Sequence, residues 1–258
     1  MRLDAEKLTF SYEGKPVLNS ASLSVETGEV LFLLGPNGSG KTTLLKIMLG
    51  ILRPLQGRIL LDNIDISAWP QKKLAAHIGY VPQDHTPPFA FSVLEVVLMG
   101  RTPYLNSFTV PSREDLNITC NALETLGINH LKNRNYTAIS GGERQLVLIA
   151  RALAQQPEFL IMDEPTSNLD YSNQHMVLDH ISRLARNGMG ILVSSHVPDY
   201  ALRYSTKAAL MRDGTVVATG LSWDVINSES LRMLYGIHVK VADVLLEEER
   251  HTKVCVPL

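Results

Sequence analysis

The sequence reads Gly35-Pro36-Asn37-Gly38-Ser39-Gly40-Lys41-Thr42 directly after an apolar run from Val30 to Leu34, and it matches the pattern G-x-x-x-x-G-K-[ST]. In such a loop, glycines let successive backbone N–H groups point at phosphate oxygens, and the N-terminus of the following helix favours anions. We expect Lys41 to reach the β- and γ-phosphates and Thr42 to bind Mg²⁺. The alternative is a glycine-rich turn that binds nothing, and the Lys-Thr pair argues against it. The stretch predicts a nucleoside-triphosphate site, followed by a helix over Lys41 to Leu49.

Length, charge and the N-terminus limit the classes of protein that fit. The 258 residues, 45% of them hydrophobic, are enough for one globular unit that could have two lobes. A formal net charge of −2 provides no basic stripe, so a nucleic-acid partner is not expected. Met1 to Glu6 does not resemble a signal peptide, and no apolar stretch approaches the roughly 18 residues of a spanning helix. We expect a cytosolic protein that does not cross a bilayer by itself.

Strand signals give way to helix signals in the first half of the chain. Short β-type runs separated by turns fill Leu3 to Leu34, which predicts an antiparallel group leading into the phosphate-loop strand. Further strands are expected at Ile59 to Asp62 and Ile78 to Val81. The pattern is then helical from about Gln83 to Gln156, with capping-box spacing at Ser92. We interpret this segment as a helical insertion.

A strand, helix, strand order follows the insertion. Strands are expected at Phe159 to Met162 and Gly190 to Ser194, with a helix over Ser172 to Arg186 between them, which predicts a parallel sheet. Asp213-Gly214 marks a hairpin turn. We predict an α/β fold with a P-loop NTPase core on a parallel sheet, an N-terminal antiparallel β-subdomain and an inserted α-helical subdomain. The main domain is expected over 1–220, with a mainly helical tail over 221–258.

Two carboxylates, Asp163 and Glu164, end the strand that starts at Phe159. They lie at the carboxyl end of the strand, where ligands bind in open α/β sheets. Asp163 fits a metal site because Mg²⁺ keeps a bound carboxylate ionised, and Glu164 can accept a proton from water attacking in line with the γ-phosphate. The alternative is that both acids only cap the next helix. A phosphate loop requires a carboxylate for its metal, which favours the catalytic interpretation.

A second glycine-rich motif, Ser140-Gly141-Gly142, precedes the helix expected over Glu143 to Gln155. A serine and two glycines at a helix N-terminus form an anion site. Alone, Ser-Gly-Gly also makes ordinary loops and caps. Between a phosphate loop upstream and Asp163-Glu164 downstream, it predicts a second phosphate contact.

In this order, the motifs resemble those of the nucleotide-binding subunit of ATP-binding-cassette (ABC) transporters, over nearly all of residues 3 to 220. The resemblance implies ATP and Mg²⁺ as ligands, with nucleotide-binding residues from Gly35 through Thr43. It also implies that Tyr12 stacks on adenine, that Gln83 touches Mg²⁺ or the attacking water, and that His196 contacts the γ-phosphate. A tyrosine on a strand, a lone glutamine and a histidine after an apolar strand are each more often packing or solvated residues. Their joint order supports the assignment.

The resemblance further implies that two cassettes pair head to tail. The phosphate loop of one copy and Ser140-Gly141-Gly142 of the other would contact the same ATP, and Ser167 to Asp170 would contact the partner. The chain has one set of motifs and no internal repeat, so hydrolysis is expected to need a homodimer or a second cassette. Glu143 and Leu146 depart from the usual Gln and Arg of the family pattern. We expect slower turnover from these departures, but not its loss.

The segment Gln83 to Arg101 resembles the corresponding part of cassettes from metal-chelate importers, which handle iron siderophores, haem, cobalamin and, in one branch, molybdate or tungstate. This implies a place on the cytoplasmic face of the cell membrane, bound to integral membrane permease subunits and served indirectly by a substrate-binding protein. Phe89 and Phe91 are candidate contacts for a permease helix, or alternatively core residues. An iron complex is the first substrate expected and molybdate the second.

Three alternatives remain open at this point. A soluble ABC ATPase acting on ribosomes or DNA is disfavoured, because such relatives generally carry two cassettes in one chain or long coiled coils. A P-loop kinase or GTPase would lack Ser-Gly-Gly ahead of the Asp-Glu strand. An exporter half is usually fused to a membrane domain.

Overall fold

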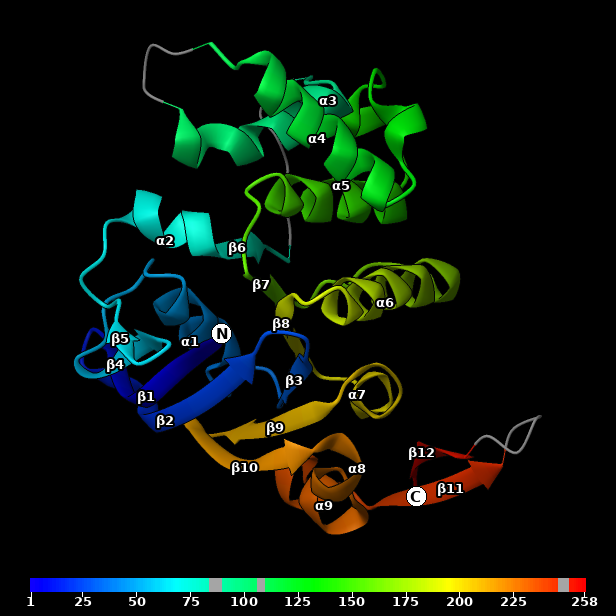
Figure 1. The fold of residues 1–258 in the computed structure, drawn as a ribbon. Coiled ribbons are helices and arrows are strands. Elements are labelled where there is room, and N and C mark those ends of the chain that lie inside the picture. The colour runs from blue at the N-terminus through cyan, green and yellow to red at the C-terminus, as the bar shows by residue number, and fades with distance from the viewer. Residues whose placement is uncertain (84–89, 106–109, 246–250) are drawn as a thin grey trace.

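The computed structural model describes residues 1–83, 90–105, 110–245 and 251–258. A six-stranded sheet runs through the molecule, with a smaller antiparallel sheet on one side of it, helices on the other, and a helical lobe at the top (Figure 1). Within the described ranges, no helix has both the length and the apolar character needed to span a membrane.

The central sheet is built mainly from parallel strands. Its members are β3 (Val30–Leu34), β6 (Ile78–Val81), β7 (Phe159–Asp163), β8 (Gly190–Ser195), β9 (Lys207–Arg212) and β10 (Thr215–Leu221). Their order is β10-β9-β3-β8-β7-β6. All neighbours pair in parallel except β10, which returns antiparallel to β9 after the turn at Asp213-Gly214. The predicted parallel sheet and hairpin are confirmed.

The N-terminal part forms a separate antiparallel sheet. It consists of β1 (Arg2–Tyr12), β2 (Lys15–Glu26), β4 (Gln56–Leu61) and β5 (Ile64–Asp65), in the order β2-β1-β4-β5. The predicted N-terminal antiparallel group is therefore confirmed. The chain leaves it after β2 to enter the central sheet at β3, as Figure 1 shows.

Helices flank the central sheet and build the lobe. They are α1 (Lys41–Met48), α2 (Gln71–His77), α3 (Val93–Leu98), α4 (Arg113–Thr125), α5 (Gly141–Leu153), α6 (Tyr171–Arg186), α7 (Pro198–Tyr204), α8 (Ser222–Val225) and α9 (Ser228–Tyr235). Short 3-10 segments cover Met99–Tyr104, Asn129–Leu131 and Tyr136–Ala138. The secondary-structure elements that the described residues form between β6 and β7 are all helices. The capping box predicted at Ser92 is present, with Glu95 as its partner.

Strand β3 shows how the central sheet joins two cores. All five of its residues are buried, and their side chains alternate between the faces. Phe32 and Leu34 belong to a core with the lobe and α5, α6 and α7, whereas Leu31 and Leu33 belong to a core with α1 and the antiparallel sheet. A strand covered on both faces reads as a continuous apolar run, which explains the sequence before the phosphate loop.

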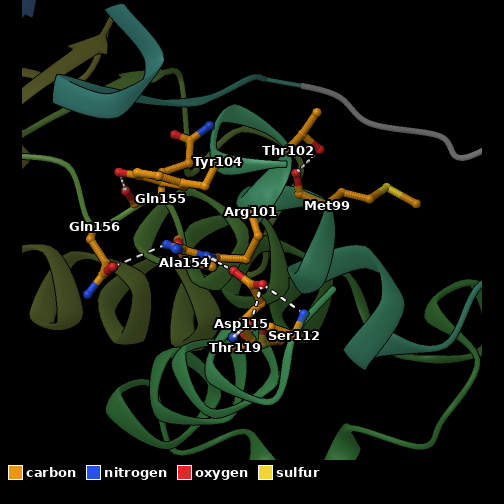
Figure 2. A network of polar contacts seen from close by, with 10 residues as sticks. All are labelled: Met99, Arg101, Thr102, Tyr104, Ser112, Asp115, Thr119, Ala154, Gln155 and Gln156. Atoms are coloured by element: carbon orange, nitrogen blue, oxygen red, sulfur yellow. Dashed lines mark hydrogen bonds and ion pairs between the residues drawn. The ribbon is translucent and has the colours of Figure 1, made fainter. Parts of the chain in front are cut away.

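A buried ion pair holds the helical lobe together (Figure 2). Arg101 Nε donates to Asp115 Oδ1 at 2.9 Å, and Arg101 Nη1 donates to the carbonyl oxygen of Ala154 at 2.8 Å. The Tyr104 ring covers the guanidinium, with 4.1 Å between Cζ and the ring centroid. Hydrogen bonds from Ser112 and then from Arg101 lower the pKa of Asp115 to about 2. The network fixes the start of α4 against the end of α5.

The C-terminal tail is helical only in its first part, which contains α8 and α9. Beyond them, β11 (Val239–Leu245) and β12 (His251–Pro257) form an antiparallel hairpin. The expectation of a mainly helical tail is therefore wrong. Val241 and Cys255 pack against the larger core, so the hairpin is held by apolar contacts that sequence periodicity alone did not reveal. The acidic run 247–249 lies outside the described residues.

Candidate functional site

Four groups of predicted site residues meet at one edge of the central sheet. Strands β3, β8, β7 and β6 are parallel neighbours, so their carboxyl ends lie side by side. Strand β3 leads into the loop that starts at Gly35, and β8 leads into His196. Strand β7 ends at the pair Asp163-Glu164, and β6 is followed by Gln83. The sheet thereby collects at one edge the groups that the sequence places far apart.

The loop from Gly35 to Gly40 has a backbone that only glycine tolerates at several points. Gly38 and Gly40 have φ angles of 81° and 103°, in the left-handed region. At Gly35, an added Cβ would lie 2.4 Å from the carbonyl oxygen of Met211 on β9. The glycine pattern is therefore a requirement of this loop and of its contact with the sheet.

Lys41 is buried beneath the loop at the start of α1. Its Nζ donates to the carbonyl oxygens of Gly35 at 2.7 Å and Pro36 at 3.1 Å, and it lies 3.9 Å from Glu164 Oε1. Burial lowers the pKa of Lys41, while the charges of Glu164 and Asp163 oppose that shift. An anion in the loop would favour the charged ammonium further.

Asp163 is held by the neighbouring strand. It is 3% exposed, and Ser194 Oγ on β8 donates a hydrogen bond to its Oδ1 at 2.6 Å. The same Ser194 oxygen accepts the backbone N–H of Glu164 at 2.9 Å. One hydroxyl thus contacts both carboxylate residues at the end of β7.

Glu164 lies between two cationic or titratable partners. Its Oε2 is 3.3 Å from Nδ1 of His196, and its Oε1 faces Lys41. The Glu164 side chain is 15% exposed, whereas that of His196 is 52% exposed. Glu164 also has a φ of 44°, unusual for a residue with a side chain. The carboxylate is therefore aimed into the site by a constrained backbone, with His196 on its solvent side.

A pocket of about 370 Å³, the phosphate pocket, opens over the loop and α1. It is lined by Val17, Asn37, Gly38, Gly40, Lys41, Thr42, Thr43, Gln83 and Glu164. Asp163, His196 and Tyr12 lie outside this lining, as do Gly35, Pro36 and Ser39 of the loop itself. Tyr12 is 45% exposed at the end of β1, edge-on to the Phe10 ring with 4.9 Å between centroids.

The Ser-Gly-Gly motif lies elsewhere, at the N-terminus of α5. Ser140 and Gly141 are exposed, and Gly141 lines a second pocket of about 220 Å³ together with Gln83, Ser167 and Asn168. Gly142 is needed for close packing, because a Cβ there would lie 2.3 Å from Oδ1 of Asn173 on α6. Of these residues only Gln83 borders both pockets, so this chain does not bring Ser-Gly-Gly into its own phosphate pocket.

Glu143 and Leu146, the two departures from the family pattern, both make contacts within this chain. Glu143 Oε2 accepts the backbone N–H of Ser140 at 2.7 Å, and this bond lowers the pKa of Glu143. Its charge therefore faces the end of its own helix. Leu146 is 2% exposed and packs in the larger core. Phe91 is partly buried against that core, while Phe89 lies outside the described residues.

Three residues near the site were not predicted from the sequence. Val17 lines the phosphate pocket from β2, Ser194 links the two carboxylates, and Tyr235 Oη donates to the backbone carbonyl of His196 at 3.2 Å. Nothing in the sequence marked Val17, which lies 18 residues before the loop in the chain. Ser194 and Tyr235 were equally unmarked, because all three contacts exist only once distant segments have packed together.

A glycine-rich loop, a buried lysine and a strand ending in two carboxylates, all at one edge of a parallel sheet, define a P-loop nucleoside triphosphatase. The family model described as "ABC transporter" matches residues 18–167. The chain therefore belongs to the ABC transporter family, whose ATP-binding subunits hydrolyse ATP.

Relatives of known type match over most of their length. A hemin import ATP-binding protein of Myxococcus xanthus is 38% identical, over 88% of this chain and 86% of its own. A molybdate import ATP-binding protein of Haemophilus influenzae is 37% identical, over 91% and 88%. A solved metal-chelate type ABC transporter, in an inward-facing conformation, is 35% identical with a TM-score of 0.88, covering 99% of this chain and 97% of that one. The similarity includes the tail.

Proposed function

We propose that this chain works as a homodimer that hydrolyses ATP to drive an importer of a metal chelate or metal oxyanion, with an iron complex as the first substrate to test and molybdate as the second. The observation that carries the proposal is the separation of the two pockets. The phosphate loop lines one and Gly141 the other, as expected if each copy supplies half of every ATP site. The hemin and molybdate importers among the relatives support the substrate class.

In this proposal Glu164 is the general base. Its carboxylate lines the phosphate pocket, where it can accept the proton of a water molecule attacking the γ-phosphate. His196, half exposed and 3.3 Å from Glu164, can turn toward the γ-phosphate and orient the base. Lys41 would exchange the carbonyls of Gly35 and Pro36 for oxygens of the β- and γ-phosphates.

The nucleotide itself would lie along the loop. The loop and helix start from Gly35 to Thr43 are proposed to hold its phosphates through their backbone N–H groups, except at Pro36, which has none, with α1 presenting the positive end of its dipole. Tyr12 is proposed to stack on adenine, because its ring is exposed and already fixed on one edge by Phe10.

The residues around the pocket fit Mg²⁺ by their chemistry. Thr42 offers a hydroxyl, Gln83 an amide oxygen and Asp163 a carboxylate, and Mg²⁺ prefers such hard oxygen ligands. Throughout the described ranges, no group of three or more His, Cys, Asp or Glu could hold a metal by itself, which suits an ion that shares phosphate oxygens. When bound, Mg²⁺ would neutralise the charge that develops on the phosphates.

Two copies are proposed to close on two ATP molecules. The exposed N-terminus of α5 at Ser140 and Gly141 would meet the γ-phosphate held by the partner copy. Ser167, Asn168 and Leu169 border the same pocket as Gly141. The segment Ser167 to Asp170 would contact the partner. ATP binding would then pull the two copies together, and hydrolysis would release them.

The proposed place of work is the cytoplasmic face of the cell membrane. The closing and opening of the two copies would move the integral membrane permease subunits bound to them. A substrate-binding protein would take part indirectly. No nucleic acid takes part in this scheme. A soluble ATPase acting on ribosomes or DNA is the rival function that the experiment must exclude.

The test is to purify tagged Glu164→Gln protein from its own membranes in mild detergent with ATP, and to identify what copurifies. Lys41→Ala is the matched control, since it should not hold the nucleotide that locks the dimer. A polytopic membrane protein in stoichiometric amount supports the proposal. Ribosomes or DNA-repair proteins, in place of a membrane protein, would contradict it.

A further inference from the structure

Ser194 is a fully buried serine on β8, with 0% of its surface exposed. Its neighbour across the sheet is Asp163, and the two residues are directly paired in the parallel register. Ser194 Oγ donates to Asp163 Oδ1 at 2.6 Å and accepts the backbone N–H of Glu164 at 2.9 Å. A hydroxyl has one donor and two acceptor sites, so both bonds can form at once and in one arrangement.

The peptide groups on both sides of Glu164 are held in place. On its N-terminal side, the amide donates to Ser194, and on its C-terminal side, the carbonyl accepts from Ser167 N at 3.0 Å and Ser167 Oγ at 2.8 Å. A φ of 44° is costly for a residue with a side chain and persists only where the surroundings over-determine it. The bond to Ser194 is therefore one of the contacts that hold the backbone from which the Glu164 carboxylate projects.

We propose that Ser194 is a positioning residue for ATP hydrolysis, which fixes the metal carboxylate Asp163 and the general base Glu164 relative to each other through one buried hydroxyl. The inference rests on the roles proposed for these two acids. Partners that orient a metal ligand commonly change metal affinity or activity by about 10- to 100-fold when removed. Ser194 differs from such partners in also holding the backbone of the base.

Removing the Ser194 hydroxyl should lower the rate of hydrolysis and the affinity for the metal ion, and should leave the affinity for ATP unchanged. Ser194 is not among the residues that line the phosphate pocket, whereas Lys41 and the loop are. In Ser194→Ala, Asp163 loses the hydroxyl that holds its Oδ1, and the backbone N–H of Glu164 loses its acceptor. We expect kcat to fall about 10- to 100-fold with KM for ATP close to wild type, and Mn²⁺ affinity of the ATP complex to fall by a similar factor.

The experiment measures kcat and KM for ATP on the full chain, and Mn²⁺ binding to the complex with a non-hydrolysable ATP analogue by electron paramagnetic resonance. Ser222→Ala is the matched control, because Ser222 is also a buried serine, 1% exposed, with its hydroxyl 2.6 Å from that of Ser205. A structural defect alone would lower the melting temperature of both variants and leave Mn²⁺ affinity unchanged.

A second pair of variants separates the hydroxyl from the fold. Ser194→Thr keeps the hydroxyl, and Ser194→Val has the same shape without it, so Thr should retain far more kcat and Mn²⁺ affinity than Val. Wild-type kcat and Mn²⁺ binding in Ser194→Ala, or equal losses in the Thr and Val variants, would overturn the inference. Glu164→Gln is measured alongside to distinguish failure of the inference from failure of the proposed function. If Glu164→Gln hydrolyses ATP as fast as wild type, the proposed function is contradicted.

Discussion

Replacing Glu164 by glutamine should remove the proposed general base while leaving the structure of the site unchanged. The amide has nearly the shape of the carboxylate, and the backbone bonds to Ser194 and Ser167 do not involve the side chain. What is lost is the proposed proton acceptor, the carboxylate 3.3 Å from His196. ATP affinity should be retained or raised, because the change also removes a negative charge 3.9 Å from Lys41 and close to the phosphates.

The expected loss in turnover is about 10²- to 10⁴-fold, the usual contribution of a positioned base. This corresponds to roughly 2.7–5.5 kcal/mol in the activation free energy. Phosphate release measured at saturating ATP gives kcat, and equilibrium binding of a fluorescent ATP analogue gives affinity. Light scattering with ATP should show a dimer that persists, since the bound nucleotide is no longer consumed.

The chain provides a close control for this substitution. Glu158 lies just before β7, at the opposite end of that strand, and its Oε2 is 3.1 Å from Nδ1 of His77. Glu158→Gln therefore makes the same chemical change in another glutamate–histidine pair and should leave kcat near wild type. Turnover of Glu164→Gln within about threefold of wild type would refute the assignment of a base, given the scale of that effect.

Three further predictions concern other parts of the site and the lobe. Lys41→Ala should weaken ATP binding by about 10- to 100-fold, as for the loss of charge-assisted hydrogen bonds, and an unchanged dissociation constant in calorimetry would contradict its phosphate role. Ser140→Arg should block ATP-dependent dimerisation yet keep ATP binding by the monomer, so a normal dimer on light scattering would refute the shared site. The low pKa of Asp115, about 2 in the folded chain against about 3.9 for an unfolded Asp, stabilises the fold above pH 4 and is lost as pH falls toward 2. Melting temperatures between pH 5 and 3 should therefore fall more steeply for wild type than for Asp115→Asn, and parallel curves would contradict the pairing.

The motifs were readable from the sequence because each is local. The glycines of the phosphate loop, the strand that ends at Asp163 and the capping box at Ser92 all consist of residues close together in the chain, where backbone geometry dictates residue type. Parallel pairing then explains why Gln83 and His196 meet at the same sheet edge.

Contacts between segments that are distant in the sequence could not be predicted from it. Ser194 and Asp163 are 31 residues apart, and nothing in a strand of the type Ile-Leu-Val-Ser-Ser marks one serine as a partner for a carboxylate. The hairpin of β11 and β12 was missed for a similar reason. The partly buried side chains of Val241 and Cys255 pack against the larger core, which is again a contact between segments distant in the sequence.

The most direct test of the central claim is ATP-driven uptake by the reconstituted importer. The permease that copurifies with this chain would be placed in lipid vesicles with the chain and ATP on the same side, and with the binding protein and a labelled iron chelate or molybdate on the other. The account predicts transport toward the ATP side that requires hydrolysis and disappears with Glu164→Gln, while Glu158→Gln supports it. Transport that is independent of ATP, or movement in the opposite direction, would contradict the account.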